Sequence, residues 1–241
     1  MRSKVIIGTA ALLAALAGSS SAQQQCGPCD SGDFVAYELK DKETMNQVEV
    51  VTSPFTTGSI LLTRTHRLLV PAGLNGAPVA NPVVHFLGVE SNAGSYDVST
   101  TPKRTFSTSL GTVTFNPGSV KFFYDPTSKS LSAPLPAPPP ATPPMLCITA
   151  RSGSKAPKPD VSTTDQFGTQ HPSLTGLDYA CVNVSLGGPA PAEAWIVCFN
   201  QKTKDALSPP DVWLTTQDLG QFPDMRVDPL DEVCVQATVQ P

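Results

Sequence analysis

The stretch that decides the fold runs from residue 145 to residue 183 and contains three landmarks, Met145-Leu146-Cys147-Ile148, Gln166-Phe167-Gly168 and Ala180-Cys181-Val182-Asn183. An apolar strand-like run opens the segment, a bulky residue with a glycine marks a turn, and a second apolar run closes it. The same three landmarks recur in the same order four times along the chain. The bulky turn residues stand at positions 55, 110, 167 and 219, so the spacings are 55, 57 and 52. Such self-similarity predicts four degenerate repeat units.

The other three units follow the same plan. Their opening runs are residues 34–37, 86–89 and 196–199, and their closing runs are residues 68–71, 123–126 and 233–236. Each closing run begins 13 or 14 positions after its bulky turn residue. Each unit reads as about three short strands, because β-branched and apolar residues partly alternate within it. The turns carry four glycines that we expect to adopt positive φ, namely Gly58, Gly111, Gly168 and Gly220.

Helical patterns are almost absent from the chain, so the expected fold class is all-β. Four degenerate three-stranded units would form two β-sandwich or barrel-like halves, at residues 34–130 and 145–241. Between them, residues 131–144 hold seven prolines in fourteen residues, a composition that favours polyproline II and cannot join a central strand. This segment is the expected linker between the halves. Alternatively, it is a long surface loop on a single sandwich.

Four cysteines, Cys147, Cys181, Cys198 and Cys234, occupy the opening and closing runs of units three and four. The matching positions in units one and two are all occupied by other residues: Ala36, Leu69, Gly88 and Tyr124. Cross-linked partners must be gained and lost together, whereas free thiols need not be, so the pattern predicts disulfides. Three pairings are possible, and we favour Cys147–Cys181 and Cys198–Cys234 because each closes one unit. Zinc ligands usually come in closely spaced pairs, so no metal or other cofactor is expected.

The first 22 residues have the character of a secretory signal peptide. Arg2 and Lys4 precede an apolar run at residues 5–16, and Ser20-Ser21-Ala22 supplies small residues for cleavage. The expected location is therefore secreted or periplasmic, where disulfides are stable. Removing the signal leaves 14 Lys and Arg against 20 Asp and Glu, a net charge of −6. That charge argues against nucleic acid as a partner, and no later run is long enough to span a membrane.

A leader at residues 23–33 contains Cys26-Gly27-Pro28-Cys29, which has the spacing of a thioredoxin-type redox site. Redox chemistry needs the first sulfur at a helix N-terminus. Here Asp30-Ser31-Gly32-Asp33 follows, and its acids would raise the thiol pKa. We therefore expect Cys26 and Cys29 to form a local disulfide or tether, with a thiol-disulfide redox protein as the alternative.

The chain offers no pattern of catalytic residues. His66 lies in the basic segment Thr63–Arg67 and is expected to face solvent, while His85 precedes a strand and His171 lies in a loop. Ser152-Gly153-Ser154-Lys155 spells Ser-x-x-Lys but lacks the companion motifs of penicillin-binding enzymes. Four acids near the C-terminus are expected to form a solvated loop: Asp224, Asp228, Asp231 and Glu232. Trp195 and Trp213 are possible binding residues that could stack on a sugar or peptide, although such rings more often fill a core.

The landmarks resemble those of an uncharacterised family of secreted bacterial repeat proteins. Units of that family open with a His-x-x-Cys-Tyr-like strand, continue through an Asp-Gln-Phe-Gly turn and close on Leu-Cys-x-Pro. The resemblance is carried by Asp165-Gln166-Phe167-Gly168, Leu68-Leu69-Val70-Pro71 with Asn75-Gly76, and His85-Phe86-Leu87-Gly88. It spans about residues 34–236 and implies the repeat architecture, but these relatives bring no known activity.

The expected function is a secreted, non-enzymatic binding or structural module of a bacterial envelope or extracellular space. Its partner would be an unidentified extracellular or cell-surface component. An alternative from another class is a carbohydrate-active or other hydrolytic enzyme whose carboxylates converge between units. Paired carboxylates can act as acid and base only when they meet in space, and the sequence does not show whether they do.

Overall fold

A computed structural model describes residues 32–241 except 81, 140 and 203–206. Within these residues the chain is built almost wholly of β-strands, and its one helical element is the short 3-10 helix η2 (Val98–Thr100). The expected all-β fold class is confirmed. The described residues contain no helix with the length and apolar character needed to cross a membrane. The predicted signal peptide at residues 1–22, and Cys26 and Cys29 of the leader, lie outside the described residues.

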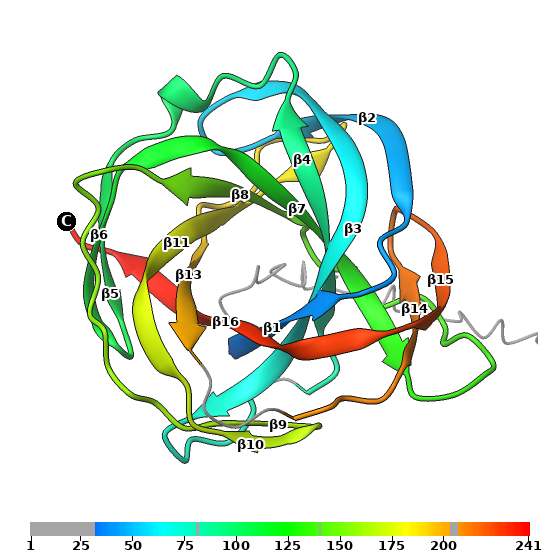
Figure 1. Ribbon diagram of the computed structural model, residues 1–241. Coiled ribbons are helices and arrows are strands. Elements are labelled where there is room, and N and C mark those ends of the chain that lie inside the picture. The colour runs from blue at the N-terminus through cyan, green and yellow to red at the C-terminus, as the bar shows by residue number, and fades with distance from the viewer. Residues whose placement is uncertain (1–31, 81, 140, 203–206) are drawn as a thin grey trace, which may run out of the picture.

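Eight strands form a closed antiparallel barrel, which Figure 1 shows along its axis. Each strand pairs with the next barrel strand along the chain, and the last pairs with the first. The barrel strands are β1 (Asp33–Leu39), β3 (Thr57–Leu74), β4 (His85–Ala93), β7 (Pro117–Ser130), β8 (Met145–Ala150), β11 (Ser173–Asn183), β13 (Trp195–Lys202) and β16 (Val227–Val239).

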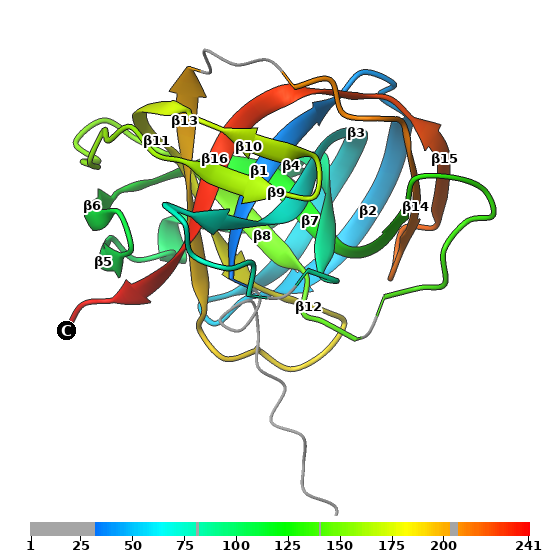
Figure 2. The same ribbon diagram turned by 90° about the horizontal axis from the view of Figure 1, so that it is seen from below.

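The remaining strands lie outside the barrel wall, between consecutive barrel strands of the sequence. Three hairpins, β5–β6, β9–β10 and β14–β15, are formed in this way, while β2 pairs with β3 and the short β12 pairs with β2. In Figure 2 the β5–β6 and β14–β15 hairpins lie on opposite sides of the barrel. The outer strands are β2 (Thr44–Thr52), β5 (Arg104–Thr108), β6 (Gly111–Phe115), β9 (Thr163–Asp165), β10 (Gly168–Gln170), β12 (Ser185–Leu186), β14 (Val212–Thr216) and β15 (Gln221–Met225).

Side-chain alternation divides the apolar residues into two buried clusters. In β1, Phe34 and Ala36 belong to one cluster, and Val35 and Tyr37 belong to the other. All eight barrel strands contribute to the first cluster, which therefore fills the barrel interior, as expected for a barrel of this strand number. The second cluster lies between the barrel wall and the outer strands. A Cβ on Gly88 would stand 2.4 Å from the Tyr124 ring, so this glycine leaves room for the aromatic filling.

The expected division into two sandwich or barrel-like halves is wrong, because strands from both halves belong to the same barrel. Residues 131–144 connect β7 to β8, and these two strands pair directly, with Phe122 opposite Cys147. The proline-rich segment is thus a surface connection between neighbouring strands. Since a barrel has no free edges along its wall, joining the halves removes the exposed edges that two separate small sheets would retain.

Both disulfides favoured from the sequence are present. Cys147 pairs with Cys181 across β8 and β11, with a Cα–Cα distance of 3.9 Å. Cys198 pairs with Cys234 across β13 and β16, with a Cα–Cα distance of 4.0 Å. The residues at the matching positions of the first half also face each other across paired strands: Ala36 opposite Leu69, and Gly88 opposite Tyr124.

Three of the four turn glycines have the expected positive φ: Gly111 at 118°, Gly168 at 139° and Gly220 at 112°. The expectation is wrong for Gly58, which lies within β3. That residue is required for a different reason, because a Cβ there would approach the backbone of Tyr96 to 2.5 Å. Glycine is therefore required for its backbone conformation at three of these positions and for its small size at the fourth.

Candidate functional site: the ionic end of the barrel

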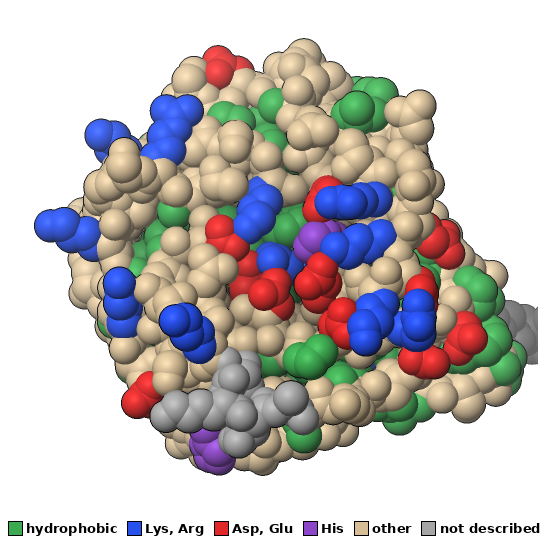
Figure 3. Space-filling view, in the orientation of Figure 1, with side chains coloured by type: hydrophobic (Ala, Val, Ile, Leu, Met, Phe, Trp, Pro, Cys, Tyr) green, Lys and Arg blue, Asp and Glu red, His purple; other side chains and the backbone are tan. Residues whose placement is uncertain are grey.

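Charged side chains gather at one end of the barrel. Figure 3 views this end and shows basic, acidic and histidine side chains together at the centre of the face. Several of these residues are buried, with Glu232 0% and Arg67 6% exposed. Titratable groups that are buried in a shared site are candidates for function. We call this group the ionic end, and it consists of Glu38, Arg64, His66, Arg67, Glu90, Lys121, Asp178, Tyr179, Asp231 and Glu232.

Four β-bulges build the ionic end. In β3, Thr65 pairs with Val89 and Arg67 with Gly88, which leaves His66 as an extra residue. The same irregularity occurs in β7, β11 and β16, where the extra residues are Lys121, Asp178 and Asp231. A bulge breaks the alternation of a strand, so two consecutive residues can reach the same end of the barrel. Each of the four extra residues is titratable.

The residues that follow the four bulges form a ring inside the barrel: Arg67, Phe122, Tyr179 and Glu232. Arg67 Nη1 donates to Glu232 Oε1 at 2.5 Å, and the Tyr179 hydroxyl donates to Glu232 Oε2. The Arg67 guanidinium lies 4.6 Å from the centroid of the Phe122 ring, and that ring packs edge-on against Tyr179 at 5.5 Å. Every member of the ring therefore contacts both of its neighbours.

Two further contacts complete the buried network. Arg67 Nη2 donates to Asp231 Oδ2 at 2.5 Å, so this guanidinium is held by consecutive carboxyl groups of β16. The bulge at Asp231 makes this geometry possible. The Tyr124 and Tyr179 hydroxyls lie 2.8 Å apart. Burial raises the pKa of both tyrosines, and so both remain protonated hydrogen-bonding groups.

The carboxyl groups of Asp178 and Glu232 come from different strands and hydrogen-bond to each other. Burial, followed by the neighbouring Asp178, raises the pKa of Glu232 to about 8, although Arg67 opposes this change. Burial acts to raise the pKa of Asp178 as well, but hydrogen bonds to Glu232 and Lys121 lower it. Lys121 Nζ lies 2.5 Å from Asp178 Oδ2. At neutral pH the pair therefore consists of a protonated acid on Glu232 and a carboxylate on Asp178.

The outer rim of the ionic end is a set of polar contacts and ion pairs near the surface. His66 Nδ1 lies 2.7 Å from Glu90 Oε1, and Arg64 donates to the same carboxylate. Lys42 pairs with Glu38 at 2.5 Å. The expectation that His66 faces solvent is wrong, because its side chain is only 14% exposed. Burial and the charges of Arg67 and Lys42 lower the pKa of this histidine.

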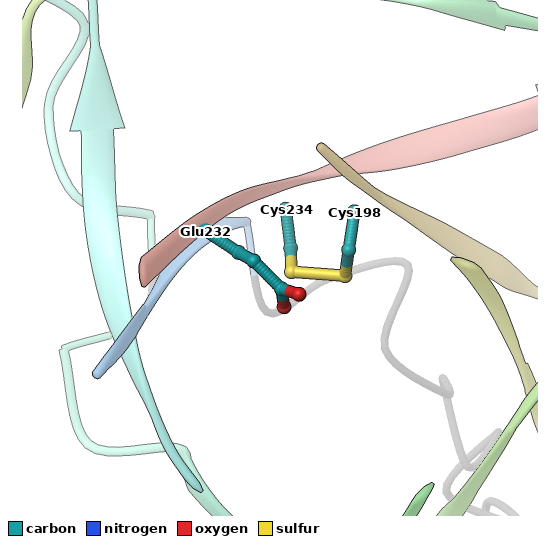
Figure 4. A group of neighbouring side chains, drawn as sticks. All are labelled: Cys198, Glu232 and Cys234. Atoms are coloured by element: carbon teal, nitrogen blue, oxygen red, sulfur yellow. A yellow bond between two sulfur atoms is a disulfide. The ribbon is translucent and has the colours of Figure 1, made fainter. Parts of the chain in front are cut away.

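Glu232 also lies beside the Cys198–Cys234 disulfide, as Figure 4 shows. Its carboxyl oxygen and the two sulfurs lie within 4.8 Å of one another, a cluster that in other proteins can hold a metal ion. Thiolates bind metals, but both sulfurs here are consumed in their mutual bond. The cluster is therefore a carboxylic acid packed on a disulfide.

Only part of the C-terminal acidic group reaches the site. Asp231 and Glu232 belong to the ionic end, which corrects the expectation that all four acids form a solvated loop. Asp228 pairs with Lys40 at 2.7 Å on the surface, and Asp224 is exposed. The physical reason is that β16 begins at Val227, so its later residues turn into the barrel.

The two tryptophans lie away from the ionic end. Trp195 is 2% exposed and packs among the rings of Phe55, Phe106 and Phe115. Its indole N–H donates to Glu193. Trp213 is half-buried on the outer strand β14. The structure thus places Trp195 in the core between the barrel wall and the β5–β6 hairpin.

The Asp-Gln-Phe-Gly segment, residues 165–168, forms the turn that joins β9 to β10. Asp165 Oδ1 accepts the backbone N–H groups of Phe167 and Gly168, and Asp165 Oδ2 accepts the Tyr37 hydroxyl at 2.6 Å. The Gln166 amide meets His85 Nε2 at 3.2 Å. These contacts tie the hairpin to the barrel strands β1 and β4.

Sequence reasoning missed Arg67, Lys121, Asp178 and Tyr179. A usable signal was present, because these residues occupy the last two positions before three of the closing landmarks. The two positions before each of the four closing landmarks hold the bulge residue and the ring residue. The shared position relative to the closing landmarks is therefore the sequence signal for the whole ring.

The charge state of Glu232 predicts a pH dependence of stability. Its pKa is about 8 in the folded chain and near 4.5 when unfolded, so folding binds a proton between these values. Its contribution is fully present below about pH 4.5 and is lost as pH rises through 8. We expect Glu232→Gln to reduce the loss of stability between pH 5 and 8.5 by about 2 kcal/mol or more, measured by urea unfolding.

Glu193→Gln is the matched control for this measurement, because Glu193 pairs with Arg104 at the surface. We expect it to leave the pH dependence unchanged. Equal slopes for the wild type and Glu232→Gln over this range would show that Glu232 is ionised in the folded chain.

Comparison with known proteins gives no relative for this architecture, since no protein-family model, no curated protein and no solved structure matches the chain.

Proposed function

We propose that this chain is a secreted, non-enzymatic binding or structural module whose barrel serves as a rigid scaffold. The observation that carries the proposal is the closed ring at the ionic end, where Arg67, Glu232 and Tyr179 satisfy one another inside the barrel. Buried groups that are hydrogen-bonded to one another are better suited to holding strands together than to converting a substrate. The two disulfides agree with an oxidising compartment.

The scaffold is inferred to consist of four degenerate units, each with two barrel strands and an outer strand or hairpin. Two observations support this inference. The landmark positions pair in all four units, either as cysteines or as Ala36 with Leu69 and Gly88 with Tyr124. The bulges also occur at one position of each unit. Repetition of this kind offers adjacent, similar surfaces for contact with a partner.

A hydrolytic enzyme is the second candidate, and a specific observation favours it. Asp178 and Glu232 come from units three and four and form a pair with one protonated and one ionised carboxyl group. Such a pair can supply a general acid and a general base. Against this role, Glu232 is fully buried and hydrogen-bonded to Tyr179 and Arg67, so a substrate would have to displace the ring.

The test uses the chain from Gln23 onward, with Glu232→Gln, Asp178→Asn and the surface control Glu193→Gln. Chromogenic ester, peptide and glycoside substrates report turnover, and co-sedimentation with insoluble bacterial envelope material reports binding. We expect sedimentation with the envelope material in all four proteins and no turnover. Turnover that is lost in Glu232→Gln and Asp178→Asn but kept in Glu193→Gln would establish the hydrolase instead.

A further inference from the structure

Two neighbouring surface pockets carry an excess of positive charge. The first has a volume of about 500 Å³ and is lined by Lys103 and Arg151 among other residues. The second has a volume of about 520 Å³ and is lined by Arg151, Lys155 and Lys158. Both pockets share Arg151, so we treat them as one feature, the basic groove. Neither an acidic side chain nor an aromatic ring is found among its described lining residues.

The backbone that carries these cations is fixed to the barrel. Arg151 N donates to Asn116 O at 2.9 Å, and Lys155 exchanges two backbone hydrogen bonds with Thr114. The Arg151 guanidinium is itself anchored, because Nη2 donates to the carbonyl of Gly118 at 3.2 Å. Prolines on both sides of Lys158 further restrict the chain there. The groove therefore presents its positive charges in a defined arrangement.

These four cations differ from those at the ionic end. Within the part of the chain that the structure describes, none of them forms an ion pair, whereas Arg64, Arg67 and Lys121 each do. Figure 3 shows basic side chains along the left flank, over β5 and β6, while most acidic side chains in this view lie at the centre and on the right. The nearest acids along the chain are already engaged as hydrogen-bond acceptors, Asp97 from Ser99, Asp160 from the Ser173 hydroxyl and Asp165 from the Tyr37 hydroxyl.

We propose that the basic groove binds an acidic polysaccharide, whose carboxylate or sulfate groups pair with Lys103, Arg151, Lys155 and Lys158. Two adjoining pockets that share one arginine suit a chain with repeated negative charges better than a single small anion. Hydroxyl and amide groups also line the groove, including Ser99, Asn116 and Ser152, and they can hydrogen-bond to sugar hydroxyls. This inference rests on the proposed binding function and names its partner class.

Other polyanions fit the groove less well. Single-stranded nucleic acid is usually held by stacking of bases on aromatic rings, and the described lining contains none. An acidic peptide would use the same cations, and so it becomes an arm of the test.

The experiment measures binding to heparin and to polygalacturonate by isothermal titration at low ionic strength. Poly-L-glutamate and single-stranded DNA are the competing polyanions. The groove variant is Arg151→Gln/Lys155→Gln/Lys158→Gln, and the control with the same charge change is Lys40→Gln/Lys42→Gln/Arg226→Gln. All substituted side chains are exposed or half-buried, and thermal unfolding verifies that both variants fold.

We expect at least one polysaccharide to bind, with an affinity that falls as salt rises and that drops about tenfold or more in the groove variant. The control variant should stay within about twofold of the wild type. Binding of heparin alone would identify sulfate groups, and binding of polygalacturonate alone would identify carboxylates. Absence of binding, equal losses in both variants, or tighter binding of DNA or polyglutamate would overturn the inference. Envelope binding that survives such a result would leave the proposed function intact, whereas cleavage of either polysaccharide would contradict it.

Discussion

Replacing Glu232 by leucine is expected to lower the free energy of unfolding by about 3–5 kcal/mol, because it removes one partner from a buried polar network. Glu232 is fully buried and accepts from Arg67 Nη1 and the Tyr179 hydroxyl. Leucine leaves both donors without that acceptor inside the barrel. Arginine cannot escape the cost by losing its proton. Urea unfolding at pH 7 measures the loss.

Two further variants distinguish the stability lost with the hydrogen-bond network from the stability lost through a change in side-chain volume. Glu232→Gln keeps an acceptor for Arg67, and we expect it to cost about 1 kcal/mol. The double variant Arg67→Met/Glu232→Leu replaces both partners by apolar side chains and should recover most of the loss, because neither partner then remains buried without the other. If the double variant were as unstable as the sum of the single changes, the ring would not act as a unit.

Removing the Cys147–Cys181 disulfide is expected to lower the free energy of unfolding by about 3–4 kcal/mol on the chain-entropy account of cross-links. The bridge closes a loop with a sequence separation of 34 residues. In a chain of this size the loss corresponds to a fall in Tm of about 10 °C. Thermal unfolding of Cys147→Ala/Cys181→Ala measures it. The Cys198–Cys234 bridge, with a separation of 36 residues, should behave in the same way.

The first strand pair offers a matched control for this prediction. Ala36 and Leu69 stand opposite each other on β1 and β3 at the position that the cysteines occupy on β8 and β11. Cys147→Ala/Cys181→Leu therefore removes the cross-link while keeping an apolar pair that the barrel already accommodates. We expect it to be more stable than the double alanine variant but still less stable than the wild type. Wild-type stability in either variant would mean that the bridge adds nothing to the scaffold.

Local patterns in the sequence predicted the all-β class and both disulfides correctly. Strands β8 and β11 could be recognised because apolar residues surround Cys147 and Cys181, and because the two cysteines appear together at landmark positions. Ala36 and Leu69, which stand at the same landmark positions as Cys147 and Cys181, also lie opposite each other. The two disulfides depend on residues 34 and 36 positions apart, and so they can be recognised by comparing the similar landmarks along the chain.

Closure of the barrel could not be predicted in this way. It requires β1 to pair with β16, with Phe34 opposite Cys234 some 200 positions later in the chain. Nothing in the local alternation of either strand distinguishes that partner from another edge strand. The prediction that the proline-rich segment is a linker between two halves was wrong for a similar reason. Its composition is compatible with any exposed connection and does not show which strands it joins.

The ionic end was hidden by the bulges that form it. The segment Thr63–Arg67 alternates like an exposed strand, but the extra residue at His66 shifts the alternation and turns both His66 and Arg67 inward. The partners of Arg67 are also distant, since Glu232 lies 165 positions away. The two-residue alternation of side chains identifies a regular strand, but it does not hold where a bulge adds a residue.

By itself, the amino-acid sequence determined the strand-rich class, the order of landmarks and the cysteine pairs, because these follow from short-range alternation and from comparison of the recurring landmarks. Only the tertiary structure decided that both halves share one barrel and that Arg67, Phe122, Tyr179 and Glu232 meet in a ring. The reason is physical: a strand presents the same pattern to any neighbour, and its partner is chosen by packing and charge pairing across the whole chain.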